Sequence, residues 1–164
     1  MIRLGPIFEK NKKFPITRTF QDHVKANPDD AYAAGFFDGE GCVGISSNKN
    51  KWGCSLFINL KQKKGFTDIL ERLKSVYGGT VSHRKDNSGA DWFAYGKTAG
   101  DFLNKIFTYS VVKKEQIIVA LAFLDLRRIY PRRLKSNGMW LERPPEFKKM
   151  QAFYIDEIKR LKRI

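Results

Sequence analysis

Short stretches of alternating apolar and polar residues constrain this chain more than any other feature, because they predict strands with two unlike faces. Residues 54–61 read CSLFINLK, in which Leu56, Ile58 and Leu60 point to one side and their neighbours to the other. Residues 42–48 read CVGISSN and alternate in the same way before the loop that follows. Together the two stretches predict a hairpin with one buried face and one largely polar face.

A second hairpin and several helices surround the first one. Residues 80–96 read TVSHRKDNSGADWFAYG, and the turn-forming residues at 86–89 predict the reversal. The segment before this hairpin, GFTDILERLKSVYGG, has helical spacing from Phe66 to Tyr77 and a glycine stop at Gly78. Apolar residues spaced by three and four predict the remaining helices, which are expected at about 28–38, 98–109, 113–130 and 145–164.

The first of these helices has clear signals at both ends. Asn27 is a good N-cap, and Pro28 suits the first helical position. Gly39 and Gly41 are expected to end the helix, because glycine is the residue most often found just past a helix C-terminus.

The order of the elements is helix, two strands, helix, two strands and further helices, which predicts an α+β fold. The two hairpins are expected to join into one antiparallel sheet, with the helices on its apolar face and a polar, basic saddle on the other. Residues 1–27 lack a regular pattern and are expected to be a basic N-terminal arm. Residues 28–164, including the C-terminal helix at 145–164, then form a single domain.

The charge of the chain indicates a polyanionic partner. Lysine and arginine number 31 against 17 acidic residues among 164, so the formal net charge is +14. A folded domain this basic usually binds DNA, RNA or an anionic membrane. No apolar run approaches membrane-spanning length and the N-terminus lacks a secretory apolar region, so no membrane partner is expected. The two cysteines, Cys42 and Cys54, show neither a zinc-site nor a disulfide pattern, which predicts an intracellular protein of the cytoplasm or an organelle interior.

The polar face of the predicted sheet suits the DNA major groove, which accepts a two-stranded ribbon and offers a full hydrogen-bonding code. Asn59 is expected to pair with adenine and Arg84 with guanine. The alternative is that these side chains face solvent without contacting a base. The candidate DNA-binding residues are Ser46, Asn48, Ser55, Phe57, Asn59, Lys61, Lys63, Lys64, Thr80, Ser82, Arg84, Asp91 and Phe93.

Asp38 and Glu40 lie two residues apart at the end of the first predicted helix, among glycines. An acid at a helix C-terminus opposes the helix dipole by roughly 0.3–1 kcal/mol, so this placement needs a reason. A structural reason is that Asp38 would accept bonds from backbone N–H groups of a following turn, while Glu40 would pair with a lysine. A chemical reason is that a DNA-cutting enzyme binds Mg²⁺ through one or two carboxylates together with phosphate oxygens and waters.

Residues 33–41, AAGFFDGEG, resemble the signature motif of the LAGLIDADG homing endonucleases. The positions that fit this motif closely are Ala34, Gly35, Phe36, Asp38, Gly39 and Gly41. Glu40 stands where the family most often has aspartate, and Ala33 replaces leucine. The resemblance extends over about residues 28–130, because the predicted order of helices and hairpins is that of the family's αββαββα core.

The resemblance implies roles for the motif residues. The motif helix packs against its counterpart across a two-fold interface, and Ala34 and Gly35 are small enough to allow that approach. Asp38 would brace the turns at this interface. Glu40 would be the ligand of a catalytic Mg²⁺ ion, for which Mn²⁺ can substitute, and the carbonyl of Gly39 would assist it.

The resemblance also implies catalytic roles outside the motif. Gln62 stands at the end of the second predicted strand, where the family often has a polar residue that orders the nucleophilic water. Lys113 stands before the long helix, where the family often has a lysine near the scissile phosphate. Lys114 is its rival, because a one-residue shift of the alignment exchanges them. For each lysine the alternative is a plain phosphate contact or a solvated surface charge.

Only one such motif is present in the sequence. The nearest second candidate, LAFLDLRR at 121–128, lacks the glycines and carries Arg127 where the second acid belongs. One motif corresponds to one half-site, so the resemblance implies a homodimer. Such a homodimer would make a staggered double-strand break at a long pseudo-palindromic site in double-stranded DNA.

Two other classes of function stay open at this point. The same fold serves non-cleaving nucleic-acid binders, such as intron RNA maturases and transcriptional regulators, so host intron RNA is a further candidate partner. A basic structural protein of a ribonucleoprotein would instead be a monomer without metal dependence. Cleavage, metal dependence and solution mass separate the three classes.

Overall fold

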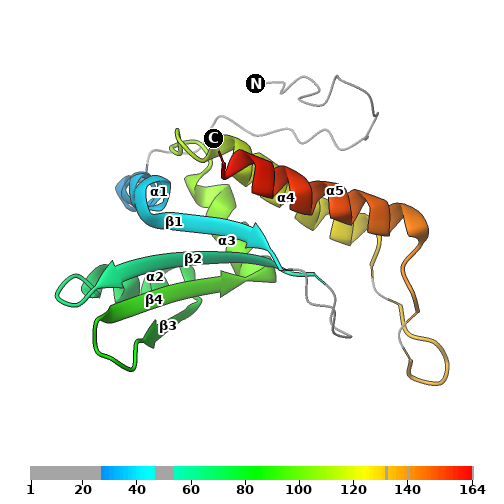
Figure 1. The fold of residues 1–164 in the computed structure, drawn as a ribbon, viewed down its shortest axis with the longest axis horizontal. Coiled ribbons are helices and arrows are strands. Elements are labelled where there is room, and N and C mark those ends of the chain that lie inside the picture. The colour runs from blue at the N-terminus through cyan, green and yellow to red at the C-terminus, as the bar shows by residue number, and fades with distance from the viewer. Residues whose placement is uncertain (1–26, 47–53, 132, 140, 164) are drawn as a thin grey trace.

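The computed structural model describes residues 27–46, 54–131, 133–139 and 141–163, which form a four-stranded antiparallel sheet and its covering helices (Figure 1). The elements follow each other as α1 (Pro28–Glu40), β1 (Gly41–Ile45), β2 (Leu56–Lys63), α2 (Asp68–Tyr77), β3 (Thr80–His83), β4 (Gly89–Tyr95), α3 (Gly96–Ile106), α4 (Lys114–Ile129) and α5 (Pro145–Leu161). The predicted α+β class and the αββαββα order with added C-terminal helices are confirmed. The predicted arm, apart from Asn27, and the candidate residue Asn48 lie outside the described residues.

Local signals explain where α1 begins, whereas the helix ends later than the sequence predicts. The side chain of Asn27 accepts a hydrogen bond from the N–H of Asp29 at 3.0 Å and so caps the helix. The helix then continues through Gly39 to Glu40, two residues beyond the predicted end, and the chain leaves it at Gly41. Glycine permits a helical conformation as well as a turn, so Gly39 does not stop a helix whose last turn is held by other contacts.

The two hairpins join into one sheet in the order β1-β2-β4-β3. Cys42 of β1 lies opposite Asn59 of β2, and Asn59 also lies opposite Phe93 of β4. Because paired residues point to the same side of a sheet, this register places all three on one face. We call it the open sheet face, and its residues are Cys42, Phe57, Asn59, Lys61, Lys63, Thr80, Ser82, Asp91, Phe93 and Tyr95.

The opposite sheet face meets the helices in one hydrophobic core. Phe102 of α3 contacts three aromatic rings, with its ring centroid 5.8 Å from that of Phe37, 5.0 Å from Tyr77 and 5.2 Å from Trp92. These rings come from α1, α2 and β4, so one side chain ties three elements to α3. Fully burying a side chain such as Phe37 stabilises the fold by about 1.5–3 kcal/mol. The core thus fixes α1 against the sheet and sets the position of the residues at its C-terminal end.

The long C-terminal helices lie on the β1 side of the sheet, where α5 packs along α4 and against the edge strand β1 (Figure 1). On α4, Ile117 and Leu121 are buried in the core, whereas Ile118 and Leu124 are only partly buried. The helical spacing predicts a helix from Phe66, but α2 begins at Asp68, and Phe66 precedes it with 71% of its surface exposed. In the described ranges, none of the helices combines the length and the apolar composition needed to cross a membrane.

Candidate functional site

Glu40 is the last residue of α1, and its side chain is exposed. Within the described residues, its carboxylate has neither a hydrogen bond nor an ion pair with another side chain. The predicted structural role, an ion pair between Glu40 and a lysine, is therefore not found in that part of the chain. An unpaired acid at the C-terminus of a helix is unfavourable for the helix, so fold stability does not explain it.

Asp38 is the structural member of the acidic pair. It accepts hydrogen bonds from the hydroxyl of Ser110 at 2.6 Å and from the N–H groups of Val111, Val112 and Lys113 at 2.7, 3.1 and 3.1 Å. Partial burial opposes the ionised carboxylate, but these hydrogen bonds outweigh it and lower the pKa of Asp38. Asp38 thus fastens α1 to the start of α4, as the structural interpretation of this acid predicts, and its role at an interface between two copies stays a prediction.

The ammonium of Lys113 lies at the C-terminal end of α1. It donates to the carbonyl oxygen of Phe37 at 3.1 Å and to the carbonyl oxygen of Asp38. A cation is favourable there because the last carbonyls of a helix carry partial negative charge. Lys114 points elsewhere, with its nitrogen 5.0 Å from the centroid of the Phe107 ring. Of the two rival lysines, Lys113 is the one held beside the motif helix.

Gln62 lies at the edge of the sheet where α1 ends. Gly41 pairs with Leu60, so Glu40 immediately precedes the first pair of the β1–β2 ladder and Gln62 lies two residues beyond that pair. On the other side of Gln62, a Cβ atom at Gly89 would lie 2.1 Å from the Gln62 carbonyl oxygen. Only glycine therefore lets β4 approach β2 this closely at the edge.

The donor atoms at this edge suit a cation whose coordination is completed by atoms of a bound substrate. The described residues contain no group of three or more His, Cys, Asp or Glu side chains able to enclose a metal ion. They offer the carboxylate of Glu40 and the carbonyl of Gly39, which lies in the last turn of α1, where helix carbonyls lack intrahelical partners. Mg²⁺ is usually bound by one or two carboxylates together with substrate phosphates and waters, so this donor set fits it.

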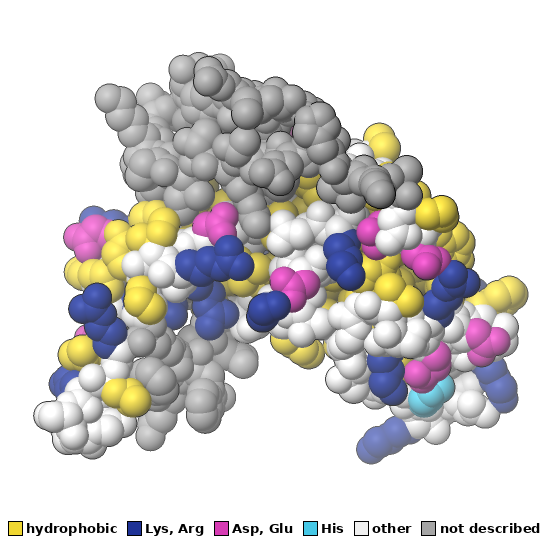
Figure 2. Space-filling model, turned by 180° about the vertical axis from the view of Figure 1, so that it is seen from behind, with side chains coloured by type: hydrophobic (Ala, Val, Ile, Leu, Met, Phe, Trp, Pro, Cys, Tyr) yellow, Lys and Arg dark blue, Asp and Glu magenta, His cyan; other side chains and the backbone are white. Residues whose placement is uncertain are grey.

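The open sheet face carries strand residues that the sequence predicts to contact DNA. Lys61 lies opposite Asp91, which lies opposite Ser82, and Phe93 lies opposite Thr80. Lys61, Thr80 and Ser82 are exposed, so their polar groups are accessible from this side. Figure 2 shows the side of the molecule opposite to that of Figure 1, where lysine and arginine side chains are spread among acidic ones.

Several predicted contacts are already engaged inside the protein. Arg84 binds Asp91 through two hydrogen bonds of 3.2 Å. The N–H of Ser55 donates to the hydroxyl of Ser46 at 3.0 Å, and that hydroxyl donates to the carbonyl of Ser55 at 3.2 Å, which closes the end of the first hairpin. Asn59 is the opposite case: its side chain is 7% exposed, and its Nδ2 has no partner among the described residues. A buried unpaired donor costs about 1–3 kcal/mol, which a bound acceptor would remove.

The remaining predicted contacts lie along β2 and just after it. Phe57 covers Gly44 on the open sheet face, since a Cβ atom at Gly44 would lie 2.5 Å from the Phe57 ring. Lys63 and Lys64 are exposed where the chain leaves β2 for α2. These lysines are therefore at the same edge of the sheet as Gln62.

The outer surface of α1 differs from the predicted one. Ala34 is fully buried in the core of its own chain, so it cannot contact a second copy, and its assignment to such an interface is wrong. Gly35 is exposed, and Cβ atoms added at Gly35 and Gly39 would have no neighbour within 4 Å. Ala31 is exposed one turn before Gly35. These three residues, spaced by four, form a stripe of small residues on the outer side of α1.

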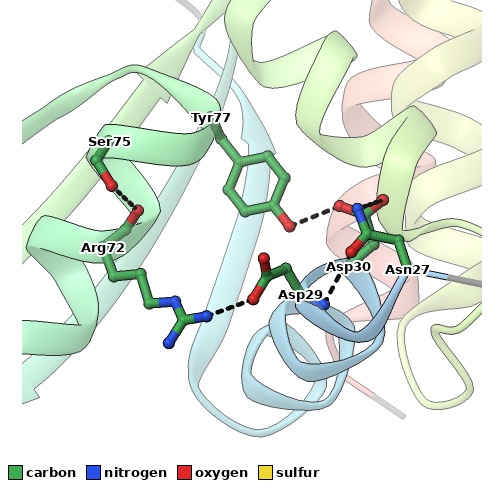
Figure 3. Close-up of polar contacts among 6 residues, drawn as sticks. All are labelled: Asn27, Asp29, Asp30, Arg72, Ser75 and Tyr77. Atoms are coloured by element: carbon green, nitrogen blue, oxygen red, sulfur yellow. Dashed lines mark hydrogen bonds and ion pairs between the residues drawn. The ribbon is translucent and has the colours of Figure 1, made fainter.

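A polar cluster at the start of α1 (Figure 3) is not predicted by any local signal. The hydroxyl of Tyr77 donates to one carboxylate oxygen of Asp30 at 2.6 Å, and the amide of Asn27 donates to the other at 3.1 Å. Arg72 binds Asp29 at 2.5 Å in the same cluster. Burial, reinforced by the Asp30 contact, raises the pKa of Tyr77. The sequence marks Asp30 as a residue of a helix start, but its partner on α2 lies 47 residues away.

Solved structures of other proteins share this fold. The homing endonuclease I-CvuI, in a crystal structure with its target, has a TM-score of 0.64 at 22% identity over 80% of each chain. The archaeal intron-encoded homing endonuclease I-Vdi141I, complexed with DNA, has a TM-score of 0.62 at 17% identity over 80% of this chain and 82% of its own. The homing endonuclease I-TnaI has a TM-score of 0.56 at 21% identity over 82% of this chain and 93% of its own. At these identities the likeness establishes the fold alone.

Sequence comparison establishes the family. No curated protein shows significant sequence similarity to the chain. The sequence profile described as LAGLIDADG endonuclease, however, matches residues 33–124, which is more than half of the 164 residues and begins in the motif helix. The chain therefore belongs to the LAGLIDADG endonuclease family.

Proposed function

We propose that this chain is a site-specific homing endonuclease that hydrolyses phosphodiester bonds of double-stranded DNA and makes a staggered double-strand break. The observation that carries the proposal is the carboxylate of Glu40 at the end of the motif helix, which has no side-chain partner in the described part of the chain. Near it, Lys113 is bonded to carbonyls of the same helix, and Gln62 lies at the same edge of the sheet. Family membership supports the class of reaction.

Glu40 and the carbonyl of Gly39 would hold a Mg²⁺ ion, for which Mn²⁺ is expected to substitute. When bound, the ion supplies an activated water and stabilises charge on the leaving oxygen. Glu40 suits this task because no other group among the described residues neutralises its carboxylate. Gly39 leaves open space beside the helix end, since a Cβ atom there would meet nothing within 4 Å.

Lys113 would stabilise negative charge on the scissile phosphate. Its ammonium has three donors, of which two are directed at carbonyl oxygens of α1. These bonds fix the nitrogen and leave one donor for a phosphate oxygen. Gln62 would orient the attacking water through its side-chain amide, which has no partner among the described residues.

The open sheet face would lie in the major groove, which admits a two-stranded ribbon. Asn59 would read a base only after its side chain turns outward, because its unpaired Nδ2 is buried. Lys61, Lys63 and Lys64 would contact phosphates, and they are exposed. The net charge of +14 favours such an encounter. The fold neighbours I-CvuI and I-Vdi141I are themselves bound to DNA in their structures.

The active form would be a homodimer. Each chain offers the carboxylate of Glu40 at the end of its motif helix, whereas cutting two DNA strands would require two such groups. The stripe of Ala31, Gly35 and Gly39 is exposed and would let two copies of α1 approach closely. If the two helices lie parallel about a two-fold axis, both copies of Glu40 lie near that axis on the same side of the dimer.

Apolar side chains on both flanks of this stripe support the same interface. At 100° per residue, Phe36 and Asp38 lie on opposite sides of the line of small residues. Tyr32 and Phe36 stack on one flank, with ring centroids 6.5 Å apart. On the other flank, Asp38 holds Val111 and Val112, whose side chains are 81% and 76% exposed. In a parallel two-fold pair, the aromatic flank of one copy would face the valine flank of the other.

Cleavage of a randomised duplex library in the presence of Mg²⁺ tests the proposal. The recovered ends report activity, recognition site and stagger together. Glu40→Gln is the control, because it keeps the size of the side chain and removes the carboxylate. A wild-type protein that binds duplex DNA without cutting it would contradict the proposal and indicate a non-cleaving binder, and RNA-stimulated splicing would identify a maturase.

A further inference from the structure

Lys162, the residue that follows α5, reaches the sheet from outside the segment that the family profile matches. Its ammonium nitrogen lies 3.1 Å from the Sγ atom of Cys42. The family profile ends at residue 124, so family membership assigns no role to this lysine. In Figure 1 the C-terminal end of α5 lies near α1 and the start of β1, in agreement with this contact.

The position of Cys42 places this ammonium on the open sheet face. Cys42 follows Glu40 by two residues and lies directly opposite Asn59, whose unpaired Nδ2 belongs to the same face. β1 is an edge strand, so a side chain from α5 can pass its free edge. Lys162 thus brings a cation from the helix layer to the DNA-facing side, next to the end of the motif helix.

Buried contacts hold the base of this side chain in place. Leu161 is buried in the core, and its carbonyl oxygen accepts a hydrogen bond from the side-chain amide of Gln116 at 3.3 Å. Gln116 lies in the first turn of α4, three residues after Lys113. The two lysines are therefore anchored through the same end of α4, and both are directed to the region where Glu40 ends α1.

We infer that Lys162 is a DNA-binding residue that contacts a backbone phosphate beside the one approached by Glu40 and Lys113. A cysteine sulfur is a weak hydrogen-bond acceptor for one of the three donors of an ammonium, so a charged phosphate oxygen is the stronger partner on this face. The inference rests on the proposed DNA-cleaving function. It makes α5 a part of the DNA-contacting surface, in addition to its role in covering β1.

A structural explanation competes with this inference. A lysine just past the C-terminus of a helix also interacts favourably with the helix dipole. That role predicts a loss of stability when Lys162 is neutralised, with no change in how DNA binding depends on salt. A phosphate contact predicts the reverse, because each neutralised phosphate contributes about 0.9 to the slope of log K against log salt.

The test compares Lys162→Gln with Lys149→Gln in a Glu40→Gln background, so that no DNA is cut. Lys149 is an exposed lysine of the same helix, roughly 20 Å away along its axis and on its opposite side. Binding of a fluorescent duplex of random sequence is followed by anisotropy over a series of salt concentrations. Lys162→Gln should bind several-fold more weakly with a slope shallower by about 0.9, while Lys149→Gln keeps the original slope. Equal slopes for all three proteins, or the same decrease in both lysine variants, would overturn the inference.

Chemical protection of Cys42 provides a second readout that does not depend on a substitution. Cys42 is partly exposed whereas Cys54 is buried, so a maleimide should react with Cys42 first. If phosphates cover Lys162 and Cys42, duplex DNA should slow this reaction. An unchanged reaction rate at saturating DNA would contradict the inference. If the wild-type protein cuts DNA but Lys162→Gln leaves the salt slope of binding unchanged, this inference alone is disproved. A wild-type protein that binds no duplex disproves the proposed function as well.

Discussion

The hydroxyl of Ser110 donates a hydrogen bond of 2.6 Å to the carboxylate of Asp38, across 72 residues of sequence. This contact and the neighbouring N–H bonds tie the last turn of the motif helix to the start of α4. The same segment supplies Lys113, whose ammonium is bonded to carbonyls of α1. The two acids of the motif therefore differ: Asp38 holds the helix end in place, whereas Glu40 has no side-chain partner among the described residues.

The lowered pKa of Asp38 predicts a defined dependence of stability on pH. An ionised aspartate with a folded-state pKa below its unfolded value stabilises the protein above the unfolded pKa, which is about 3.9. That stabilisation is lost as the pH falls through the folded-state pKa. Asp38→Asn should cost about 1–3 kcal/mol at neutral pH and flatten the loss of stability below about pH 5. Urea unfolding at several pH values measures both effects, with Asp156→Asn on the exposed side of α5 as the control.

The buried cluster at the other end of α1 predicts a loss of stability for Tyr77→Phe. This change removes the hydroxyl that donates to Asp30 at 2.6 Å and leaves a buried carboxylate oxygen with fewer donors. The expected cost is about 1–3 kcal/mol in urea unfolding. Tyr95→Phe is the matched control, because Tyr95 is exposed, and it should change stability by less than about 0.5 kcal/mol. Equal effects of the two substitutions would show that the cluster does not anchor α1.

The stripe of small residues on α1 predicts opposite effects of Gly35→Leu on folding and on assembly. Within one chain the new side chain has open space, and replacing a helical glycine stabilises the helix by roughly 0.5–1 kcal/mol. In a dimer built on this stripe, the same side chain would separate the two helices. Light scattering should therefore report a folded monomer. Ala152→Leu, on an exposed position of α5, should leave the solution mass unchanged, and a Gly35→Leu variant that stays dimeric would exclude this interface.

The two neighbouring lysines before and at the start of α4 should differ sharply in activity. Lys113→Gln removes a cation held at the end of α1, whereas Lys114→Gln removes one that lies over the ring of Phe107. Loss of one charge-stabilising donor typically slows a reaction by about 10²–10³-fold. Single-turnover cleavage should show a loss of this size for Lys113→Gln and a much smaller one for Lys114→Gln. The reverse order would place Lys114 at the reaction.

Much of the fold follows from local patterns, while the details of the site depend on contacts between distant residues. Alternation along β2 is enough to put Asn59 and Lys61 on one face, and the turn residues at 86–89 are enough to define the second hairpin. No local signal distinguishes Ala34 from Gly35, because either is small enough for a close helix contact. Only packing against the core shows that Ala34 faces inward.

The length of α1 and the surroundings of its acids show the same limitation. Gly39 is a residue type common at helix ends, yet contacts from the segment before α4 hold the last turn of α1 in a helical conformation. Lys162 and Cys42 lie 120 residues apart, so their proximity follows from the docking of α5 on the edge strand. Such pairs depend on the assembled layers of the fold, which sequence periodicity does not specify.

Metal-dependent cleavage by wild-type protein and by Glu40→Gln, on a duplex recovered from the library, tests the central claim most directly. Affinity is measured with Ca²⁺, and single-turnover cleavage is measured with Mg²⁺ on the same DNA. If Glu40 supplies the metal-binding carboxylate, Glu40→Gln should bind this duplex about as tightly as the wild type and leave both strands intact. A Glu40→Gln protein that cuts the duplex at the wild-type rate would contradict the account.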